Sequence, residues 1–422
     1  MTYNDALSYI YSFMGKKNIH KDNNSHISNV ESILSILGYK QTFRVIHITG
    51  TKGKGSTTLC LSKMIESTGS KVATFTSPHI KSERERFRIN GECISEYDFV
   101  CIVKKVKNVL DNDNYNITVF EIFTIIGLYY FYIQNVDYAC IEVGIGGLYD
   151  CTNIVKSDIS IITSISYDHT DILGDSLESI AIQKCGIIKP YSKVVSSSNI
   201  EVIEIIKREA IDKKSGIYIL YRDFNFSVLE NSNQRLTFEY MENQNKYLFN
   251  TTLLGMHQAE NISLAFKAFT LLFENSSIYR VAIDSIRDFT IDARLTFFKN
   301  DNVDIIVDGA HNSKSLEVVL NNVLSWYDDI ILLFAPIIGK DLDGMIGVLK
   351  NYDFEIIVSA TTYKESDSEN TMKYFENYKN ITHISDFKIA MSYANNIAKE
   401  KNKALLVIGS LYSASEYINL YS

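Results

Sequence analysis

The most informative stretch of the chain is residues 47–58, which read HITGTKGKGSTT. It follows the β-branched run 43–48, typical of a buried strand, and precedes residues 59–65, which carry a helical pattern. A strand, a glycine-rich turn and a helix are the context of a phosphate-binding loop, because glycines let backbone N–H groups close on phosphate oxygens. We therefore predict a nucleotide site whose loop residues are Gly50, Thr51, Gly53, Lys54, Gly55, Ser56 and Thr57.

Two kinds of side chain in this loop suit a triphosphate. Lys54 can reach the β- and γ-phosphates, and Ser56 or Thr57 can offer a hydroxyl to Mg²⁺. The spacing departs from G-x-x-x-x-G-K-[ST], because Gly55 separates the lysine from the serine. The alternative is a glycine-rich turn that binds no ligand, but the order of the elements favours the phosphate site.

Composition narrows the class of protein. A length of 422 residues favours two domains, and a net charge of −8 argues against a general nucleic-acid binder. The six cysteines form no C-x-x-C pair, which favours reduced thiols over disulfides or a zinc site. The polar N-terminus is unlike a signal peptide, and the apolar run 122–133 is too short to span a bilayer. We expect a cytoplasmic protein without nucleic-acid or membrane partners.

Strands and helices alternate along the chain, which predicts an α/β fold with a mostly parallel sheet covered on both faces. We place a P-loop-containing ATPase domain at residues 1–292 and a smaller, Rossmann-like α/β domain at residues 293–422. The expected strands are 43–48, 71–75, 137–143, 159–163, 303–307, 329–334, 354–359 and 404–408. The expected helices include 3–14, 27–37, 119–134, 175–184, 257–273, 313–325 and 385–399, with a loop at 16–25.

Several polar residues follow predicted strands, at the sheet edge where α/β proteins bind ligands. Glu142 there suits Mg²⁺ or a Mg²⁺-bound water, although an ordinary strand-end acid is the alternative. His169 can ligate a metal, with Asp168 or Asp171 orienting it. Lys184, from physics alone, completes a helix C-terminus that Gly186 caps.

Other candidates lie later in the chain. Gln258 and Asn261 share one helix face, Arg294 lies at the expected domain junction, and Asp308 and His311 follow the strand 303–307. An arginine and an aspartate from different segments can hold a nucleotide from its far side.

Together these segments resemble the folylpolyglutamate synthase/dihydrofolate synthase family, a branch of the Mur-type ATP-dependent amide ligases. The resemblance extends from His47 to Tyr412. It rests on an ordered set of motifs at residues 47–56, 76–79, 142–147, 150–153, 162–164, 168–170, 184–187, 257–261, 308–312 and 409–412. The chain departs from the family at Leu148, where an arginine is usual.

The resemblance implies roles for individual residues. Ser56 and Glu142 match ligands of one of two Mg²⁺ sites, and His169 matches a ligand of the other. Lys184 matches a lysine that CO₂ converts to a carbamate, which displaces the capping interpretation. The positions matched to ATP contacts are Asn261, Arg294, Asp308 and His311, and those matched to the pterin side are Thr76, Ser77, Pro78, His79, Phe120, Asp150, Thr152 and Asn153.

The reaction implied is ligation of L-glutamate to a pterin or folate carboxylate, through an acyl phosphate made with ATP. Lys54, His169 and Lys184 are the expected catalytic residues, and a monomer is expected. The acid can be dihydropteroate, a reduced folate or both, and we favour a bifunctional enzyme. Two alternatives stay open: a Mur-type ligase for another acid, such as poly-glutamate or a cell-wall precursor, and a P-loop protein that binds nucleotide without ligation.

Overall fold

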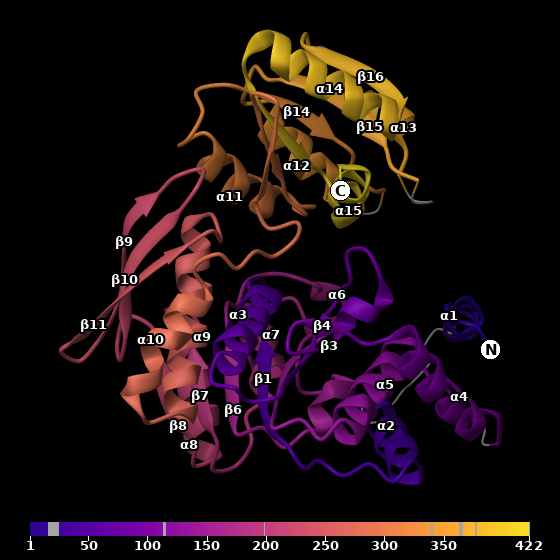
Figure 1. Cartoon of the computed structure of the whole chain (residues 1–422), viewed down its shortest axis with the longest axis vertical. Helices are drawn as coiled ribbons and strands as arrows, with labels where there is room; N and C mark the ends of the chain where they lie inside the picture. The colour runs from indigo at the N-terminus through magenta and orange to yellow at the C-terminus, as the bar shows by residue number, and fades with distance from the viewer. Residues whose placement is uncertain are drawn as a thin grey trace. The chain divides into compact units, whose positions relative to one another are not determined.

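The computed structural model describes residues 1–15, 25–112, 115–197, 199–338, 341–362, 366–375 and 378–421, so the predicted loop 16–25 lies almost wholly outside the described residues. The chain divides into two compact units (Figure 1). The first comprises residues 1–227, 239–249 and 257–286, and the second comprises 228–238, 250–256 and 287–422. The second unit thus takes residues 228–238, 250–256 and 287–292, which lie before the predicted boundary at 292/293.

The first unit is built on a mostly parallel sheet with the strand order β4-β3-β2-β5-β1-β6-β7-β8. Its strands are β1 Arg44–Thr49, β2 Val72–Phe75, β3 Phe87–Ile89, β4 Glu92–Cys93, β5 Tyr138–Glu142, β6 Ile159–Ile162, β7 Lys193–Ser196 and β8 Gly216–Ile219. The antiparallel pairings lie at one edge of the sheet, where β3 pairs with β2 and with β4. The central strand β1 pairs in parallel with β5 and β6, so the loops after these three strands meet at one edge of the sheet.

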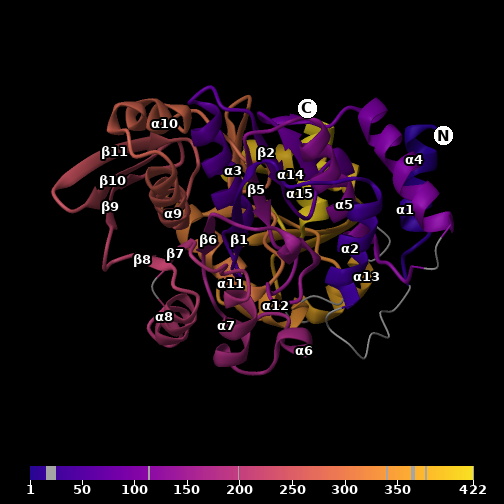
Figure 2. The ribbon, with the colours of Figure 1, turned by 90° about the horizontal axis from the view of Figure 1, so that it is seen from below.

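Helices cover this sheet, as the sequence predicted. They are α1 Tyr3–Tyr11, α2 Ser25–Ile36, α3 Lys54–Glu66, α4 Glu96–Asn112, α5 Val119–Ile133, α6 Thr170–Leu173, α7 Leu177–Cys185, α8 Ile203–Asp212, α9 Met256–Leu272 and α10 Tyr279–Ser285, with short 3₁₀ turns η1 Glu83–Arg86, η2 Cys151–Ile154 and η3 Ser276–Ile278. Helix α5 is buried along most of its length, and α1 packs against α4 (Figure 2). Within the described ranges, every helix is too short or too polar to cross a membrane.

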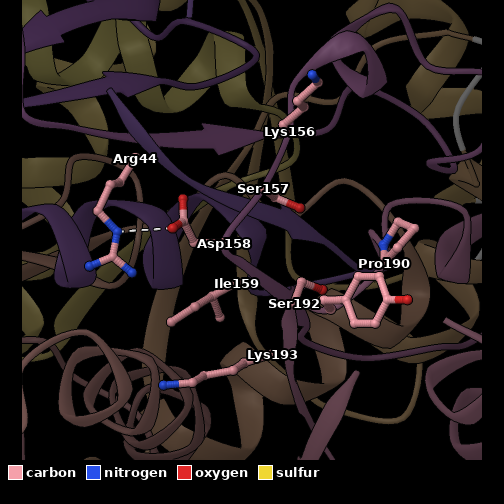
Figure 3. Close-up of a pocket in the computed structure, with 9 residues that line it drawn as sticks. Arg44, Lys156, Ser157, Asp158, Ile159, Pro190, Ser192 and Lys193 are labelled. Carbon is pink, nitrogen blue, oxygen red and sulfur yellow. Dashed lines mark hydrogen bonds and ion pairs between the residues drawn. The ribbon is translucent and has the colours of Figure 1, made fainter. Parts of the chain in front are cut away.

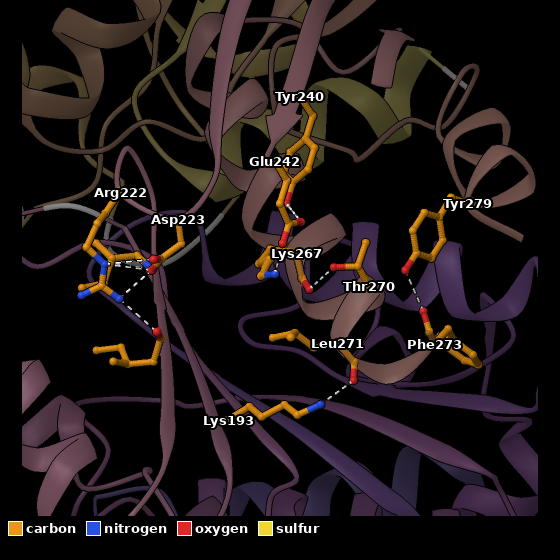
Figure 4. Close-up of polar contacts among 12 residues, drawn as sticks. Lys193, Arg222, Asp223, Tyr240, Glu242, Lys267, Thr270, Leu271, Phe273 and Tyr279 are labelled. Carbon is orange, nitrogen blue, oxygen red and sulfur yellow. Dashed lines mark hydrogen bonds and ion pairs between the residues drawn. The ribbon is translucent and has the colours of Figure 1, made fainter. Parts of the chain in front are cut away.

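An ion pair fixes helix α9 within the first unit. The Lys267 ammonium contacts the Glu242 carboxylate (Figure 4). It lies 4.4 Å from the centre of the Tyr218 ring, and only 4% of the lysine side chain is exposed. Glu242 belongs to β10 Leu236–Glu242, which lies between β9 Asn225–Asn231 and β11 Asn245–Thr251 in a three-stranded sheet. Lys193 of β7 donates to the carbonyl oxygen of Leu271 at 2.9 Å, which ties the end of α9 to the large sheet.

The second unit contains its own sheet, with the strand order β12-β13-β17-β14-β15-β16. The strands are β12 Thr296–Asn300, β13 Val303–Val307, β14 Ile330–Phe334, β15 Glu355–Ala360, β16 Ile381–Asp386 and β17 Ala404–Ile408. The helices are α11 Ser313–Val323, α12 Leu342–Leu349, α13 Ser368–Met372, α14 Phe387–Lys401 and α15 Leu411–Tyr421, with a 3₁₀ turn η4 Lys373–Phe375. The strands predicted at 303–307 and 404–408 are confirmed to the residue, whereas β12 and β16 were not predicted.

Candidate active site

The glycine-rich loop lies between β1 and α3, as the sequence predicted. Gly50 and Gly53 have positive φ, +150° and +86°. A Cβ atom at Gly50 would lie 1.9 Å from Thr163 Oγ1, and one at Gly53 would lie 2.2 Å from Asn261 Oδ1. Both positions therefore need glycine for conformation and for space.

The segment after β6 supports this loop from one side. The Thr51 amide donates to the Ser164 carbonyl at 2.7 Å, and the Lys52 amide donates to Ser164 Oγ at 2.9 Å. Thr163 Oγ1 in turn donates to the Lys52 carbonyl at 2.5 Å. The loop thus takes its shape from contacts within the protein.

Two predicted metal ligands and one predicted ATP contact lie around the same loop. Ser56 and Glu142 are 3% and 4% exposed, and a Cβ at Gly55 would lie 3.6 Å from Glu142 Oε2. Gln258 Nε2 donates to Ser56 Oγ at 3.5 Å, and Asn261 Nδ2 donates to Gln258 Oε1 at 3.0 Å. Sequence reasoning placed Gln258 on this helix face but gave it no role.

The donor set fits Mg²⁺, which prefers hard oxygen ligands and keeps waters and substrate phosphates in its shell. A hydroxyl and a carboxylate beside the glycine-rich loop would supply the protein's share of such a shell. Among the described residues, no group of three or more histidine, cysteine, aspartate or glutamate side chains gathers to hold a metal. Phosphate and water oxygens would therefore complete the coordination.

The two predicted catalytic lysines have different surroundings. The Lys54 ammonium donates to the carbonyls of Gly50 and Thr51 at 2.9 and 3.4 Å, so its predicted contact with phosphates stays a prediction. Lys184 is 3% exposed at the end of α7. Burial, and then the charge of Lys54, lower the pKa of Lys184 to about 7.

Gly147 and Gly186 allow the loop after β5 to pack onto the last turn of α7. A Cβ at Gly147 would lie 2.9 Å from the Lys184 carbonyl oxygen, and one at Gly186 would lie 2.3 Å from the Leu148 Cα. Gly186 caps the helix as predicted, and its φ of −57° is right-handed rather than the left-handed conformation that a C-terminal glycine often adopts. The glycine is needed because Leu148 approaches so closely.

His169 lies at the predicted edge of the sheet, immediately before α6. Its φ is +47°, and its Nε2 atom lies 3.8 Å from Asp168 Oδ1. With 44% of its side chain exposed, the imidazole is accessible to a ligand. The role of His169 at a second Mg²⁺ remains a prediction.

The predicted substrate loop at Thr76–His79 is joined to the metal side of the site. The Ser77 amide donates to Glu142 Oε2 at 2.9 Å, and the Ser77–Pro78 peptide bond is cis. His79 Nδ1 accepts a hydrogen bond from Arg86 Nε at 3.0 Å. Phe120 lies beside the loop after β5, since a Cβ at Gly144 would come within 2.6 Å of its ring.

Asp150 holds the loop after β5 closed. Its Oδ2 accepts from the amides of Gly144 and Ile145, both at 3.1 Å, and its Oδ1 accepts from the Thr152 amide and hydroxyl at 2.9 and 2.5 Å. The Thr152 hydroxyl has one hydrogen, which it donates to Asp150. It therefore accepts a hydrogen bond from Nε2 of the buried His47 at 2.9 Å.

Burial of Asp150 and the hydrogen bonds of Asn153 also shape this part of the site. Burial raises the pKa of Asp150, against the effect of its hydrogen bonds. Asn153 Nδ2 donates to the carbonyls of Leu148 and Gly186 at 3.0 and 3.1 Å.

Among the predicted residues of the second unit, Asp308 and His311 follow β13, and Arg294, which precedes β12, lies beside them, since a Cβ at Gly309 would lie 3.4 Å from its Nη1. Asp308 accepts from the amides of Leu295 and Ala310 at 2.9 and 2.8 Å, and burial raises its pKa while Arg294 opposes that shift. Arg294 Nη1 donates to the Ala293 carbonyl at 3.0 Å, and His311 Nδ1 lies 3.0 Å from the Gly309 carbonyl oxygen. Their contact with a nucleotide stays a prediction.

A pocket of about 450 Å³ lies at the opposite edge of the large sheet, beside the starts of β1, β6 and β7 (Figure 3). Its lining includes Arg44, Asp158 and Lys193. Arg44 Nε pairs with Asp158 Oδ1 at 2.9 Å, and Lys193 is already bound to the Leu271 carbonyl. The pocket is therefore separate from the predicted site, and Arg44 and Lys193 in its lining have partners within the protein.

Comparison with known proteins gives a consistent result. The Mur ligase middle domain matches residues 48–269, and the glutamate ligase domain of Mur ligases matches residues 293–411. The dihydrofolate synthase/folylpolyglutamate synthase of Bacillus subtilis is 28% identical over 407 residues, covering 92% of this chain and 93% of the relative.

Two further similarities involve Lacticaseibacillus casei. Its folylpolyglutamate synthase is 30% identical over 362 residues, covering 82% of each chain. The solved apo form of L. casei FPGS covers 100% of both chains with a TM-score of 0.87 at 25% identity.

Proposed function

This chain belongs to the Mur ligase family and, within it, to the folylpolyglutamate and dihydrofolate synthases, and from that premise we propose that it ligates L-glutamate to a pterin or folate carboxylate with ATP. One observation carries the assignment. Ser56, Glu142 and Asn261 come from three separate segments and gather around a phosphate loop that other residues already hold in shape.

The proposed reaction has two transfers. The substrate carboxylate attacks the γ-phosphorus of ATP, which forms an acyl phosphate and releases ADP. The amine of glutamate then attacks the acyl carbon, phosphate leaves, and an amide forms with loss of a proton. The amides of residues 50–56 and the Lys54 ammonium would hold the phosphates and offset the negative charge that develops on them.

We assign Ser56 and Glu142 to one Mg²⁺ and His169 to a second. When bound, these ions would neutralise phosphate charge. Asn261, Arg294, Asp308 and His311 would contact ATP, and we place the ATPase domain at 1–292 and the smaller domain at 293–422. A monomeric, cytoplasmic enzyme fits this proposal.

Lys184 is proposed to become a carbamate. The neutral amine nitrogen would bond to the carbon of CO₂ and lose one proton, so that an uncharged buried amine becomes an anionic carbamate. Near-complete burial and a pKa of about 7 supply the neutral amine that this reaction needs. If Lys184 is a carbamate, the Lys184→Ala variant should lose ligase activity. It should regain part of that activity when short carboxylic acids are added, but not when chloride is added.

The acid is proposed to be dihydropteroate, a reduced folate or both, bound on the side of Thr76–His79, Phe120, Asp150, Thr152 and Asn153. Phe120 supplies an aromatic surface next to the loop after β5, which suits a flat heterocycle. The absence of the usual arginine at Leu148 leaves the choice between these acids to experiment.

One assay tests the proposal. Enzyme, ATP, Mg²⁺ and L-glutamate are incubated separately with dihydropteroate, tetrahydrofolate or a UDP-muramyl precursor, and phosphate release and product mass are measured. We expect phosphate release that needs both glutamate and a pterin acid, with a product enlarged by one glutamate. Activity with the muramyl precursor alone, or nucleotide hydrolysis indifferent to acid and glutamate, would refute it.

A further inference from the structure

Helix α1 contacts the turn η1, which follows the predicted substrate loop Thr76–His79, although helix and turn are far apart in sequence. The Tyr11 hydroxyl donates to Glu83 Oε1 at 2.6 Å, and the Tyr3 hydroxyl donates to Glu83 Oε2 at 3.4 Å. The helix precedes the segment 48–269 that the Mur ligase middle domain matches. Two tyrosines of one helix thus converge on one carboxylate of η1.

The segment that contains Glu83 is a closed turn. The Glu85 carboxylate accepts from the amides of Ile80, Lys81 and Ser82 at 3.0, 2.7 and 2.8 Å. This leaves the Glu83 carboxylate, with 16% of its side chain exposed, directed at α1 and at His79. Burial raises the pKa of Glu83, but the hydrogen bond from Tyr11 and the nearby His79 imidazole hold this pKa below its usual range. Glu83 is therefore a carboxylate at neutral pH.

Glu83 connects α1 to His79 and Arg86. Since His79 Nδ1 accepts from Arg86 Nε at 3.0 Å, a neutral His79 carries its proton on Nε2, which lies 3.9 Å from Glu83 Oε1. The guanidinium carbon of Arg86 lies 4.8 Å from the centre of the buried Phe123 ring, which limits how it can turn.

The other end of the same loop contacts the metal side of the site. The Ser77 amide donates to Glu142 Oε2 at 2.9 Å. Residues 76–86 therefore span from helix α1 to the proposed Mg²⁺ ligand. Loss of the hydrogen bond from Tyr11 to Glu83 should displace the His79 imidazole and the Arg86 guanidinium, whereas Ser77 keeps its hydrogen bond to Glu142.

We propose that Tyr11 is a positioning residue for the acid substrate: through Glu83 it fixes His79 and Arg86, so that helix α1 sets the affinity for the pterin or folate acid. The inference rests on the proposed function, which assigns His79 to the substrate side. A planar imidazole and a guanidinium, held at a fixed angle, suit a flat heterocycle with an anionic carboxylate. The P-loop lies outside this set of contacts.

The test is Tyr11→Phe, which removes one hydroxyl and keeps the ring. We expect KM for the pterin acid to rise by about three- to tenfold, which is less than the roughly 10- to 150-fold cost of losing a direct hydrogen bond to a charged group, because Tyr11 acts on the acid only through Glu83; kcat and KM for ATP should stay within about twofold. Tyr9→Phe is the matched control, because Tyr9 lies on the same helix but its hydroxyl contacts Asp111 at 3.4 Å, away from the loop. We expect no change in any parameter for this control.

A second variant keeps the test decisive if Tyr11→Phe folds poorly, as judged by thermal unfolding. Glu83→Gln retains the shape and removes the charge, and should raise the same KM selectively. The inference is overturned if Tyr11→Phe matches Tyr9→Phe, or if KM for ATP rises as much as KM for the acid. A wild-type protein that ligates no pterin acid would instead overturn the proposed function.

Discussion

Replacing Gly53 by alanine tests whether Asn261 is part of the nucleotide site. The new Cβ would lie 2.2 Å from Asn261 Oδ1 and 3.2 Å from its Cγ, whereas ordinary contact begins at 3.4 Å. Asn261 cannot rotate away freely, because its Nδ2 atom donates to Gln258 at 3.0 Å and the side chain is buried in α9. The amide must therefore withdraw from the loop by more than one ångström.

The expected effect follows from that displacement. A misplacement of about 1 Å in a positioning group can cost about 100-fold in rate. We expect kcat/KM for ATP to fall by about 10- to 100-fold, which is about 1.4–2.7 kcal/mol of transition-state stabilisation. The alanine also costs about 1–2 kcal/mol of folding stability, because Gly53 has a φ of +86°.

Gly69→Ala separates the two effects. Gly69 also has a φ of +86°, but nothing lies within 4 Å of a Cβ placed there. Both variants should lose stability from backbone strain in urea unfolding, Gly53→Ala with an added loss from the displaced Asn261, and only Gly53→Ala should lose activity in initial-rate assays over a range of ATP concentrations. Equal kcat/KM values for ATP in the two variants would show that the contact with Asn261 has no part in nucleotide binding.

Three further predictions concern stability. In CO₂-free buffer, where no carbamate forms, the Lys184 amine has a pKa of about 7 in the fold and 10.5 when exposed, so the unfolded chain binds more protons between these values. The free energy of unfolding should therefore rise with pH in that window by up to about 1.4 kcal/mol per unit relative to Lys184→Met, and parallel pH profiles would contradict this. Thr152→Val should lower the free energy of unfolding in urea by about 1–3 kcal/mol, because Asp150 loses a buried donor. Thr152→Ser keeps the hydroxyl and should therefore lose little stability. Equal losses in the two variants would show that the hydroxyl does not contribute. Glu242→Gln should lower the free energy of unfolding more than Lys267→Met does. The lysine side chain is 4% exposed and the glutamate side chain 22%, so only the glutamate can be rehydrated when its partner is removed. A larger loss for Lys267→Met in urea unfolding would be evidence against this.

The sequence predicted well what depends on local pattern. The strand 404–408 is a continuous apolar run and the strand 303–307 is apolar except for Asp304, and both match the structure. The strand β16 at 381–386 was missed because its residues are half-exposed at a sheet edge and lack such a run. Within the site, the order of glycines, lysine and hydroxyls was enough to locate the loop, and the strand end located Glu142.

Contacts between distant segments could not be predicted in the same way. The bond from Tyr11 to Glu83 joins residues 72 positions apart, and neither residue has a motif around it. The close approach of Leu148 to Gly186 was hidden for another reason, since a glycine after a helix more often indicates a left-handed cap. The hydrogen bonds of Lys54 to its own loop likewise depend on side-chain conformation rather than on sequence.

The support that Thr163 and Ser164 give to residues 50–53 has a thermodynamic consequence. A loop that is rigid before its ligand arrives has already lost its conformational entropy during folding, so little of the nucleotide's binding energy should be spent on ordering it. Calorimetry of ATP binding should then report a small unfavourable entropy, and amide exchange in this loop should be slow even without nucleotide.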